Sequence, residues 1–448
     1  MKRTELIDIY QSAIKAADPY RAVREHLSLT GDTLSAGGAE YDLRGFTRII
    51  VIGAGKGTAP MAQAVEDILH DRINEGIVIV KYGHTRPLRK IVQREAAHPL
   101  PDEAGLRATS EIRDLLKEAG KETLVLCLLS GGASSLLVAP ADGIALADKR
   151  AITDLLLSSG ADINELNSVR KHISAVKGGR LAEIAYPATI VTMILSDVIG
   201  DRLDVIASGP TVPDSSGFGD ALGVIHRYSL EEKIPSGVFS LLHLGVSGVM
   251  PDTPKSGAVF FQHVRNIIVG SIRQSIEAAQ GRATTLGFEP HVLTYELQGE
   301  AHDAARFLAS RSVEIRSAMH PGESPCCLLA GGETTVTVKG KGKGGRNQEL
   351  ALAFAIEIAG MPGIAMLSAG TDGTDGPTDA AGAVVDGDTV AKAREQGMEP
   401  VDYLANNDSY EFFRKFDELT RAKAHLMTGP TGTNVMDLQI ILIERPIA

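Results

Sequence analysis

Residues 46–58 join an apolar run to a glycine-rich turn: Phe46-Thr47-Arg48-Ile49-Ile50-Val51-Ile52-Gly53-Ala54-Gly55-Lys56-Gly57-Thr58. The run from Phe46 to Ile52 has the continuous apolar character of a strand buried on both faces. After the turn, apolar residues recur at helical spacing, at Met61, Val65, Ile68 and Leu69. A strand, a glycine turn and a helix in this order predict the first unit of a parallel α/β sheet.

The same alternation continues on both sides of this unit. Strand-like runs at 76–80, 123–129 and 188–195 are separated by helical stretches. Upstream, residues 5 to about 30 are predicted to be helical, because apolar side chains including Leu6 and Ile9 share one face. The pattern predicts a Rossmann-like, doubly wound N-terminal domain with its ligand site at the C-terminal ends of the strands.

A second series of strands follows residues 251–257, a proline- and glycine-rich segment that we interpret as a linker. Its strand-like runs are 266–269, 291–295, 327–329, 334–338, 364–367 and 438–443. Because 334–338 alternates and closely follows its neighbour, we expect an antiparallel pair and a mixed sheet. The predicted domains are therefore residues 1–250, Rossmann-like, and residues 251–448, a smaller α/β domain.

The composition is that of an ordinary globular protein. Of 448 residues, 44% are hydrophobic and 23% are charged. The formal net charge of -11 argues against a general nucleic-acid binder, since phosphate backbones attract basic surfaces. We find no apolar run long enough for a membrane span and no signal peptide. We expect a cytoplasmic protein whose partners are small molecules, with neither nucleic acid nor membrane among them.

The turn after the first strand suits an anion, with Gly53, Gly55 and Lys56 as candidate binding residues. It opens a helix, whose free N–H groups and dipole favour negative charge. A lysine at this position is electrostatically unfavourable unless an anion binds between it and the helix. The alternative is a solvated loop lysine.

Two familiar glycine motifs do not fit this turn. A Walker A loop would need glycine at Ile50 and serine or threonine at Gly57. A dinucleotide motif would need glycine or alanine at Thr58, and an acidic residue where the second strand ends at Lys81.

Polar loops follow the third and fourth strands. The third strand leads into Ser130, Gly131, Gly132 and Ser134, whose hydroxyls and bare backbone suit phosphate or carboxylate oxygens, although serine and glycine are also common in turns. Asp197 follows the fourth strand. Its carboxylate could accept a proton from a substrate hydroxyl, hold a magnesium ion, or only cap a turn.

A basic stretch lies between these two strands. It contains Arg170, Lys171 and His172, followed by Lys177 and Arg180. Either it binds a substrate anion, with Arg170 and Lys177 as our candidates, or it is the polar face of a helix. We interpret His172 as structural.

The second half carries another basic loop. Within residues 339–349, glycines separate three lysines from Arg346, directly before a predicted helix. Flexible glycines would let the backbone wrap phosphates, and arginine offers paired contacts to their oxygens.

An acidic loop follows at residues 370–379. It places Asp372, Asp375 and Asp379 close together, and a hard divalent cation would relieve their mutual repulsion. We therefore expect Asp372 and Asp375 to hold Mg²⁺. Glycine cradles, isolated cations and clustered carboxylates together are typical of phosphoryl transfer, which relies on positioning and charge neutralisation.

These loops resemble, in order, those of the type-II glycerate 2-kinase family, whose C-terminal half is called MOFRL and whose members have also been labelled hydroxypyruvate reductases. The resemblance covers nearly the whole chain. It rests on eight motifs: Ile52–Lys56, Leu129–Ser134, Ser196–Asp201, Ser208–Thr211, Gly331–Val336, Gly344–Glu349, Gly370–Gly376 and Gly429–Asn434. One departure is Ala133, where we would expect glycine.

The resemblance implies a kinase that phosphorylates the 2-hydroxyl of D-glycerate from ATP with Mg²⁺, in a cleft between the two domains. It also implies that Lys56 and Arg346 are the catalytic cations, and we add Asp197 as the group that orients or deprotonates the hydroxyl. The remaining candidates for binding nucleotide or substrate are Glu333, Gly345, Asn347, Asn407, Thr431 and Asn434. Monomer and homodimer both stay open.

The position of the reacting hydroxyl has a modest physical argument of its own. If a cation at Arg170, Lys171 or Arg180 holds the carboxylate, the adjacent 2-hydroxyl is fixed more rigidly than the 3-hydroxyl. Two rival functions are an NAD(P)H-dependent hydroxypyruvate reductase and a non-catalytic sensor of a sugar-acid phosphate. The poor fit to the dinucleotide motif counts against the reductase. A sensor would have no need of the carboxylates in residues 370–379.

Overall fold

The computed structural model describes residues 2–320 and 323–445. The chain forms two compact units. The N-terminal unit is Pro19–Val269, and the C-terminal unit combines the chain up to Asp18 with everything from Gly270 onward. Within the described residues no helix is long and apolar enough to cross a membrane.

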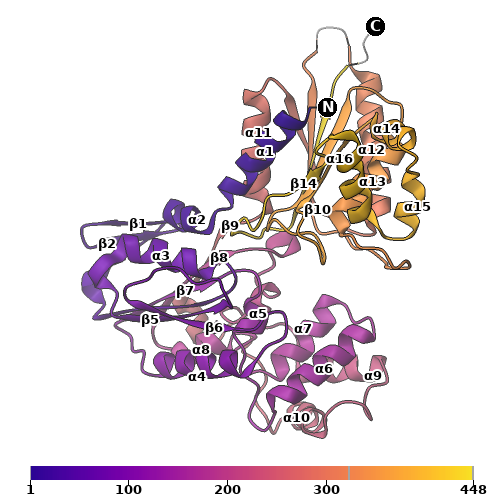
Figure 1. Ribbon diagram of the computed structural model, residues 1–448. Helices are drawn as coiled ribbons and strands as arrows, with labels where there is room; N and C mark the ends of the chain where they lie inside the picture. The colour runs from indigo at the N-terminus through magenta and orange to yellow at the C-terminus, as the bar shows by residue number, and fades with distance from the viewer. Residues whose placement is uncertain (1, 321–322, 446–448) are drawn as a thin grey trace. The chain divides into compact units, whose positions relative to one another are not determined.

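The N-terminal unit is built on a six-stranded sheet in the order β6-β5-β4-β7-β8-β9 (Figure 1). The pairs β6/β5, β5/β4, β4/β7 and β7/β8 are parallel, which confirms the predicted Rossmann-like sheet. The strands are β4 (Arg48–Ala54), β5 (Glu75–Lys81), β6 (Ile91–Ala96), β7 (Thr123–Leu129), β8 (Thr189–Leu195) and β9 (Val264–Gly270). Every residue of β7 is buried, as its unbroken apolar run predicts for a central parallel strand.

Helices cover both faces of this sheet, with α3 on one and α4 and α8 on the other (Figure 1). A second cluster of helices, α6, α7, α9 and α10, has an apolar core of its own. The helices of the unit are α2 (Pro19–His26), α3 (Thr58–Leu69), α4 (Glu103–Lys117), α5 (Ala133–Leu136), α6 (Leu146–Ser158), α7 (Ile163–His172), α8 (Arg180–Ala185), α9 (Phe218–Arg227) and α10 (Ser236–Val246). A small antiparallel sheet is formed by β1 (Leu27–Thr30), β2 (Thr33–Ala36) and β3 (Ala39–Asp42).

The C-terminal unit contains a mixed sheet in the order β10-β11-β15-β12-β13-β14, as predicted. The strands are β10 (Glu289–Leu297), β11 (Cys326–Gly332), β12 (Ile364–Gly370), β13 (Gly382–Asp386), β14 (His425–Leu426) and β15 (Asp437–Ile443). Only the β10/β11 pair is parallel among those described.

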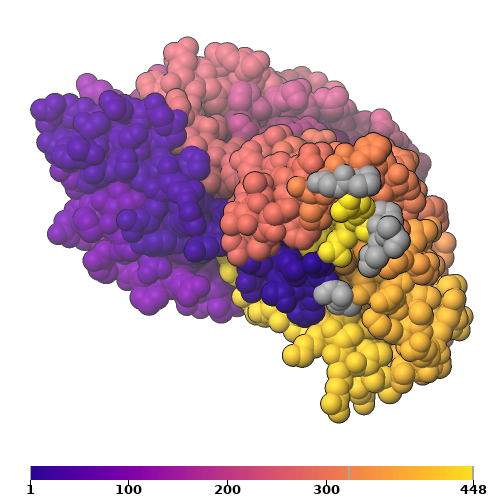
Figure 2. All heavy atoms as spheres, turned by 90° about the horizontal axis from the view of Figure 1, so that it is seen from above, coloured from indigo at the N-terminus to yellow at the C-terminus, as the bar shows by residue number. Residues whose placement is uncertain are grey.

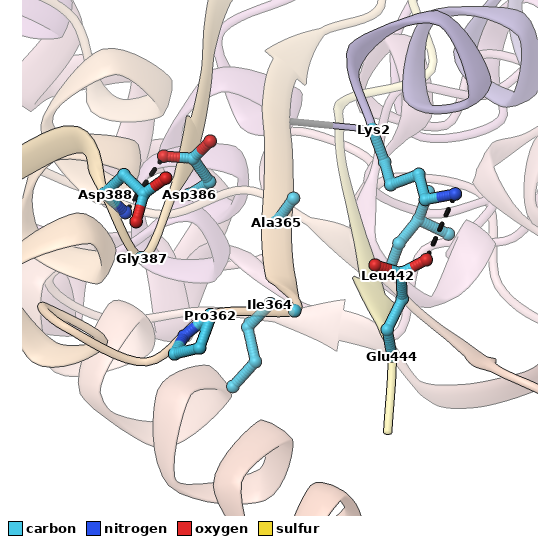
Figure 3. Close-up of a pocket in the computed structure, with 10 residues that line it drawn as sticks. Lys2, Pro362, Ile364, Ala365, Asp386, Gly387, Asp388, Leu442 and Glu444 are labelled. Carbon is cyan, nitrogen blue, oxygen red and sulfur yellow. Dashed lines mark hydrogen bonds and ion pairs between the residues drawn. The ribbon is translucent and has the colours of Figure 1, made fainter. Parts of the chain in front are cut away.

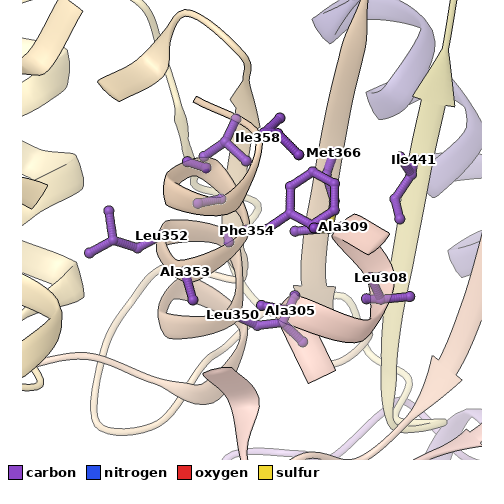
Figure 4. Close-up of a cluster of buried hydrophobic side chains, with 14 of the residues drawn as sticks. Ala305, Leu308, Ala309, Leu350, Leu352, Ala353, Phe354, Ile358, Met366 and Ile441 are labelled. Atoms are coloured by element: carbon purple, nitrogen blue, oxygen red, sulfur yellow. The ribbon is translucent and has the colours of Figure 1, made fainter. Parts of the chain in front are cut away.

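One face of the mixed sheet packs on α12 and α13, where Phe354 points toward Met366 and Ile441 (Figure 4). The first helix, α1, lies with α11 in the same unit and appears in Figure 2 as indigo against salmon and yellow. The helices are α1 (Arg3–Ala16), α11 (Ile272–Thr285), α12 (Ala301–Ala318), α13 (Arg346–Glu357), α14 (Thr389–Glu395), α15 (Pro400–Ala405) and α16 (Ser409–Thr420).

Two sequence predictions about the middle of the chain are wrong. Residues 251–257 are no linker, because Thr253 is 1% exposed and its hydroxyl donates to Asp214 Oδ2 at 2.9 Å, within the N-terminal unit. The run 266–269 is part of β9 in the N-terminal sheet, where Asn266 Nδ2 donates to Thr211 O at 3.3 Å. The division between the units therefore falls after Val269 instead of at residue 251.

Two predicted elements near the ends also differ. The helix expected over 5–30 breaks after Ala16, because Pro19 disfavours helical geometry in the residue before it. It resumes as α2 from Pro19 to His26 and then gives way to β1. The strand expected over 334–338 does not form. Thr335 makes an isolated bridge to Glu300, and the Glu300 carboxylate accepts hydrogen bonds from the N–H and hydroxyl of Thr337.

Candidate active site

The turn after β4 is tied to the turn after β7 by hydrogen bonds. Lys56 N donates to Gly131 O at 2.8 Å, and Gly57 N donates to Ser130 Oγ at 2.9 Å. Gly55 has a φ of 142°, and a Cβ there would lie 2.0 Å from Ser130 Oγ. Because these N–H groups are already paired, the anion site expected at this helix depends on the Lys56 side chain and much less on the helix terminus.

The loop after β7 supplies backbone donors beside Lys56. In the part of the chain that the structure describes, the N–H groups of Gly131 and Gly132 donate to no protein acceptor. Gly132 has a φ of 87°, a conformation that glycine adopts readily. Two adjacent free N–H groups next to a lysine can bind an oxyanion.

More cations gather at the same edge of the sheet. Lys81 ends β5, and His98 follows β6 and packs over Gly132. Burial, together with the charges of Lys56 and Lys81, lowers the pKa of His98 to about 4. His98 is therefore neutral at pH 7, and the positive charge here comes from the two lysines. No described acidic side chain forms an ion pair with Lys56 or Lys81.

Asp197 lies just beyond β8, at the same C-terminal strand ends, and is partly exposed. Gly53 is the last residue but one of β4, and a Cβ there would lie 2.4 Å from Leu128 O. Gly53 thus lets β4 and β7 approach closely, and its role is in packing.

The basic stretch divides into paired and unpaired cations. Lys171 pairs with Asp214 at 3.0 Å, and Arg180 Nη1 donates to Lys171 O at 2.9 Å. Arg170 and Lys177 have no ion-pair partner among the described residues. Lys171 is thus neutralised by Asp214. Arg180 is directed to the Lys171 carbonyl, and Arg170, Lys177 and Arg180 all lack a carboxylate partner among the described residues.

In the C-terminal unit the strand register brings three carboxylates to one sheet edge. Asp437, the first residue of β15, pairs with Gly332 of β11 on one side and Gly370 of β12 on the other. Glu333 follows Gly332, and Asp372 follows Gly370 by two residues. A Cβ on Gly370 would lie 3.4 Å from Asp372 Oδ1 and 3.5 Å from Asp437 Oδ1.

Arg346 binds this carboxylate group from the first residue of α13. Its Nε and Nη2 donate to the two oxygens of Asp437 at 2.5 and 3.0 Å, and Nη1 lies 2.6 Å from Glu333 Oε1. Burial raises the pKa of Glu333, the Arg346 charge opposes that rise, and Asp437 and Asp372 add to it. With three carboxylates against one guanidinium, the cluster is net negative and suits a cation.

Asp375 has a different environment from Asp372. It is 2% exposed, and its two oxygens accept four hydrogen bonds from the backbone and side-chain N–H groups of Asn347 and Gln348, at 2.9 to 3.3 Å. Asp375 thus satisfies the first N–H groups of α13. Asn347 is equally buried, and Gly345 lets Asp375 approach, since a Cβ there would lie 2.3 Å from Asp375 Cγ.

The carboxylates do not cluster as the spacing in 370–379 suggested. Asp379 accepts a hydrogen bond from Tyr410 OH at 2.7 Å, away from Asp372. Within the described residues no group of three or more histidine, cysteine or acidic side chains is arranged to hold a metal. Asp372 Oδ1 accepts two hydrogen bonds from Thr374, whereas its Oδ2 has no partner in the described chain. Since Mg²⁺ commonly binds one or two carboxylates and completes its shell with water and phosphates, Asp372 fits such an ion.

The glycine–lysine loop is not free to wrap phosphates with its backbone. The N–H groups of Lys339 and Gly340 donate to Asn407 Oδ1 at 2.8 and 2.9 Å, and that of Lys343 donates to Asp408 Oδ1 at 2.9 Å. The lysine side chains are exposed. Asn407 is therefore an anchor of the loop, and charge rather than backbone N–H groups is what the loop can offer a ligand.

The last candidate loop packs on the acidic loop. Thr431 Oγ1 donates to Thr371 O at 2.5 Å, and Thr431 N donates to Asp372 O at 3.2 Å. Asn434 Oδ1 accepts from Met436 N at 3.2 Å. These contacts position the start of β15 and with it Asp437.

Two pockets in the C-terminal unit lie outside the carboxylate group. One, of about 90 Å³, is at the opposite end of the sheet, where Ile364 begins β12 and Lys2 pairs with Glu444 at 3.1 Å (Figure 3). The other, of about 370 Å³, is lined by Arg306 and Lys339 but also by Glu300 and Glu349. Of the residues that the sequence singled out, the larger pocket contains Asn407 and the ends of the basic loop, Lys339 and Glu349, but neither pocket contains Arg346 or Asp372.

Comparisons with known proteins give the family. Residues 5–243 match a domain of unknown function, DUF4147, and residues 326–437 match the MOFRL family. D-glycerate 2-kinase of Thermotoga maritima is 42% identical over 443 residues, covering 98% of this chain and 97% of that protein. Glycerate 2-kinase of Pyrococcus horikoshii is 43% identical over 432 residues, with 96% and 95% covered. The chain belongs to the glycerate kinase family.

Solved structures agree with this membership. The crystal structure of glycerate kinase from Thermotoga maritima matches with a TM-score of 0.85 at 42% identity, covering 98% of this chain and 99% of that one. An Agrobacterium vitis protein provisionally named hydroxypyruvate reductase is also 40% identical, covering 98% of this chain and 94% of that protein. As a member of the glycerate kinase family the chain is a kinase, which implies a nucleotide substrate.

Three residues that lie beside the candidates of their own unit escaped sequence reasoning. Asp437 is brought to Arg346 by antiparallel pairing, although a lone acid at the start of an apolar run could have drawn attention to it. His98 follows the edge strand β6. This strand was not predicted, because charged residues interrupt its apolar pattern. Lys149 is found in α6 as a lysine that is only 4% exposed.

Proposed function

We propose that this kinase transfers the γ-phosphoryl group of ATP to the 2-hydroxyl of D-glycerate, giving 2-phospho-D-glycerate and ADP. The observation that carries the proposal is the division of charge between the two sets of strand ends. The N-terminal unit offers lysines and free backbone N–H groups, and the C-terminal unit offers a net-negative carboxylate group. Phosphoryl transfer from a metal–nucleotide complex needs both.

The reaction forms a bond from the 2-hydroxyl oxygen to the γ-phosphorus and breaks the bond from that phosphorus to the bridging oxygen of ADP. We assign the hydroxyl proton to Asp197, at the end of β8. Lys56 and the N–H groups of Gly131 and Gly132 stabilise charge on the transferring group. Ser130 accepts from Gly57 and so holds the Lys56 turn in place.

Arg346 has a second part in the proposal. Asp437 and Glu333 fix its guanidinium, so that its remaining N–H groups keep one orientation toward a phosphate. Mg²⁺, when bound, would neutralise charge on the nucleotide phosphates. Asp372 would hold it through the free Oδ2, while Asp375 keeps the start of α13 in place.

The relatives support the acceptor, since two of them are named glycerate 2-kinases. A hydroxypyruvate reductase is the second candidate, favoured only by the provisional name of the Agrobacterium relative. We further propose a cytoplasmic location; the number of subunits stays open.

One pair of assays separates these functions. Protein, D-glycerate and Mg-ATP should release ADP, and the release should require glycerate. Hydroxypyruvate should cause no loss of NADH beyond the rate without protein. Glycerate-independent or absent ADP release, or rapid hydroxypyruvate-dependent NADH loss, would contradict the proposal.

A further inference from the structure

One group of neighbouring cations in the N-terminal unit has no carboxylate partner among the described residues. They are Lys149 of α6, Arg170 of α7 and Lys177 in the loop that follows α7. Lys149 is 4% exposed and Lys177 is 1% exposed. Within the described residues none of the three forms an ion pair. Buried positive charges without a counter-ion are unstable, so the group invites an anion.

Two polar atoms of this group are donors without acceptors. Lys149 Nζ and Asn167 Nδ2 are buried and have no hydrogen-bond partner among the described residues. Lys177 Nζ donates to Ala207 O at 3.2 Å. Asn167 Oδ1 is occupied by the hydroxyl of Ser208 at 3.0 Å, which leaves the amide nitrogen of Asn167 for a ligand.

The two basic side chains that follow Arg170 in the sequence have carboxylate partners. One residue beyond Arg170, Lys171 pairs with the fully buried Asp214 at 3.0 Å. His172 Nε2 lies 2.9 Å from Asp252 Oδ1. The missing counter-charge at Lys149, Arg170 and Lys177 is therefore a local property of this site.

The site is continuous with the phosphoryl-binding loop. Ser208 Oγ lies 3.2 Å from Ser134 Oγ, and Ser134 is two residues beyond Gly132. A small hydroxy acid whose carboxylate binds among the cations would thus lie beside the loop that carries Gly131 and Gly132. A carboxylate suits the buried end, since it presents two oxygens to several donors.

We propose that Lys149, Arg170 and Lys177, with the amide of Asn167, bind the carboxylate of the acceptor substrate. The identity of the acceptor as glycerate rests on the proposed function. The sequence had already offered Arg170 and Lys177 for a substrate anion. Lys149 is added to them, and Lys171 and Arg180 are no longer proposed as carboxylate ligands. The same cations could instead bind phosphate oxygens of the nucleotide, and the experiment below separates these two anions.

The protonation of the lysines is consistent with this proposal. Burial, with a smaller effect from Arg170, lowers the pKa of Lys149 to about 7. Burial and the charges of Lys149 and Arg170 also lower the pKa of Lys177. A bound carboxylate would favour the charged forms.

The test compares the wild-type chain with Lys149→Met and with Lys121→Met, an exposed lysine of the same unit. The probes are D-glycerate, its neutral amide and Mg-ADP, each read by the thermal unfolding midpoint. D-glycerate should raise the midpoint of the wild type and of Lys121→Met but not of Lys149→Met. The amide should raise none, and Mg-ADP should raise all three. Without ligand, Lys149→Met should unfold no earlier than the wild type, because methionine keeps the stem and removes an uncompensated charge.

Kinetics provide a second readout with Arg170→Gln, a less buried position. The KM for D-glycerate should rise at least about tenfold in Lys149→Met and Arg170→Gln, while the KM for Mg-ATP changes less than about twofold. Unchanged glycerate shifts and KM values in both variants would overturn the inference and leave the kinase function standing. Loss of the Mg-ADP shift in place of the glycerate shift would assign the cations to the nucleotide and also overturn it.

A separate outcome would contradict glycerate as the acceptor but still support a carboxylate site at these cations. D-glycerate would then have no effect on the wild type, but another small hydroxy acid, such as D-lactate, would raise the midpoint of the wild type and not of Lys149→Met. If no small carboxylate shifts the wild type, the inference is wrong.

Discussion

At the scale of single residues, the proposed role of Lys56 can be tested most directly by mutation. Lys56→Met should lower kcat about 10²- to 10³-fold, because the change keeps the stem and removes the charge that faces the transferring group. Steady-state kinetics measure this, with Lys121→Met as the matched control and thermal unfolding as the check on folding. Near-normal kcat would make Lys56 a solvated loop lysine, as the sequence alone also allowed.

The two aspartates of the acidic loop should respond differently to loss of charge. Asp372→Asn should raise the Mg²⁺ concentration needed for half-maximal rate with little effect on stability, because Asp372 Oδ2 has no partner in the described part of the chain. Asp375→Asn should lower the free energy of unfolding by about 1–3 kcal/mol, because its amide would face N–H donors of Asn347 and Gln348.

Magnesium titrations and denaturant unfolding of both variants check this pair. A magnesium effect confined to Asp375→Asn would restore Asp375 as the metal ligand. An Asp372→Asn variant with a normal magnesium titration would move the metal elsewhere, with Asp197 and Asp201 next to be examined.

The lowered pKa of the buried Lys149 predicts that the stability of the folded chain depends on pH. Its pKa in the folded chain, about 7, is below the ordinary value of 10.5. The unfolded chain therefore binds more protons between these values, and folded stability rises with pH across this window. Relative to the wild type, Lys149→Met should gain most stability near or below about pH 7 and lose that gain toward about pH 10. Unfolding midpoints of the ligand-free proteins at several pH values measure the difference, and a gain that does not change with pH would contradict the assignment.

At the scale of elements, the anchoring of the glycine–lysine loop could not be predicted from its composition. Lysines among glycines indicate a mobile loop, yet the amide oxygens of Asn406 and Asn407 accept hydrogen bonds from its backbone. Asn407→Gly keeps the positive φ of 51° available and removes the amide. Hydrogen exchange at the N–H groups of Lys339 and Gly340 should then become faster, while exchange in β12 stays slow. Unchanged protection would mean that other contacts hold the loop.

Elements with a clear pattern could be predicted from sequence. The runs that became β7 and β8 are continuous and apolar, and each ends in a polar residue, so both the strands and the position of Ser130 and Asp197 followed. The strand expected over 334–338 failed because alternation alone does not say what a segment pairs with. The true neighbour of β11 is β15, which begins more than a hundred residues later.

Candidate site residues could be proposed from the sequence where a glycine-rich loop marks them, as for Lys56 and Arg346. Asp437 was not, because it depends on antiparallel register between sequence-distant strands. Lys149 was not, because a lysine in an amphipathic helix is ordinarily solvated, and only the packing of α6 buries it. The chemical character of a loop could be predicted from the sequence, whereas the pairing of distant strands and the burial of single side chains could not.

At the scale of the whole molecule, an acidic chain carries local sites of both signs. The net charge is -11, yet Lys56, Lys81, Lys149, Arg170 and Lys177 lie in the N-terminal unit without acidic partners among the described residues. The C-terminal unit gathers Glu333, Asp372 and Asp437 at one end of its sheet, where Arg346 pairs with Glu333 and Asp437. This division is the arrangement expected of an enzyme that binds an acidic acceptor and a metal–nucleotide complex.

The central claim is the product, and one coupled assay tests it most directly. Enolase consumes 2-phosphoglycerate and not 3-phosphoglycerate, so the kinase reaction is run with enolase and without phosphoglycerate mutase. Carboxylate binding by buried cations holds the 2-hydroxyl more rigidly than the 3-hydroxyl, and small displacements of a reacting group are costly. We predict an immediate phosphoenolpyruvate signal in step with ADP release. A signal that appears only after mutase is added would contradict the 2-product, and ADP release without either signal would contradict glycerate as the acceptor.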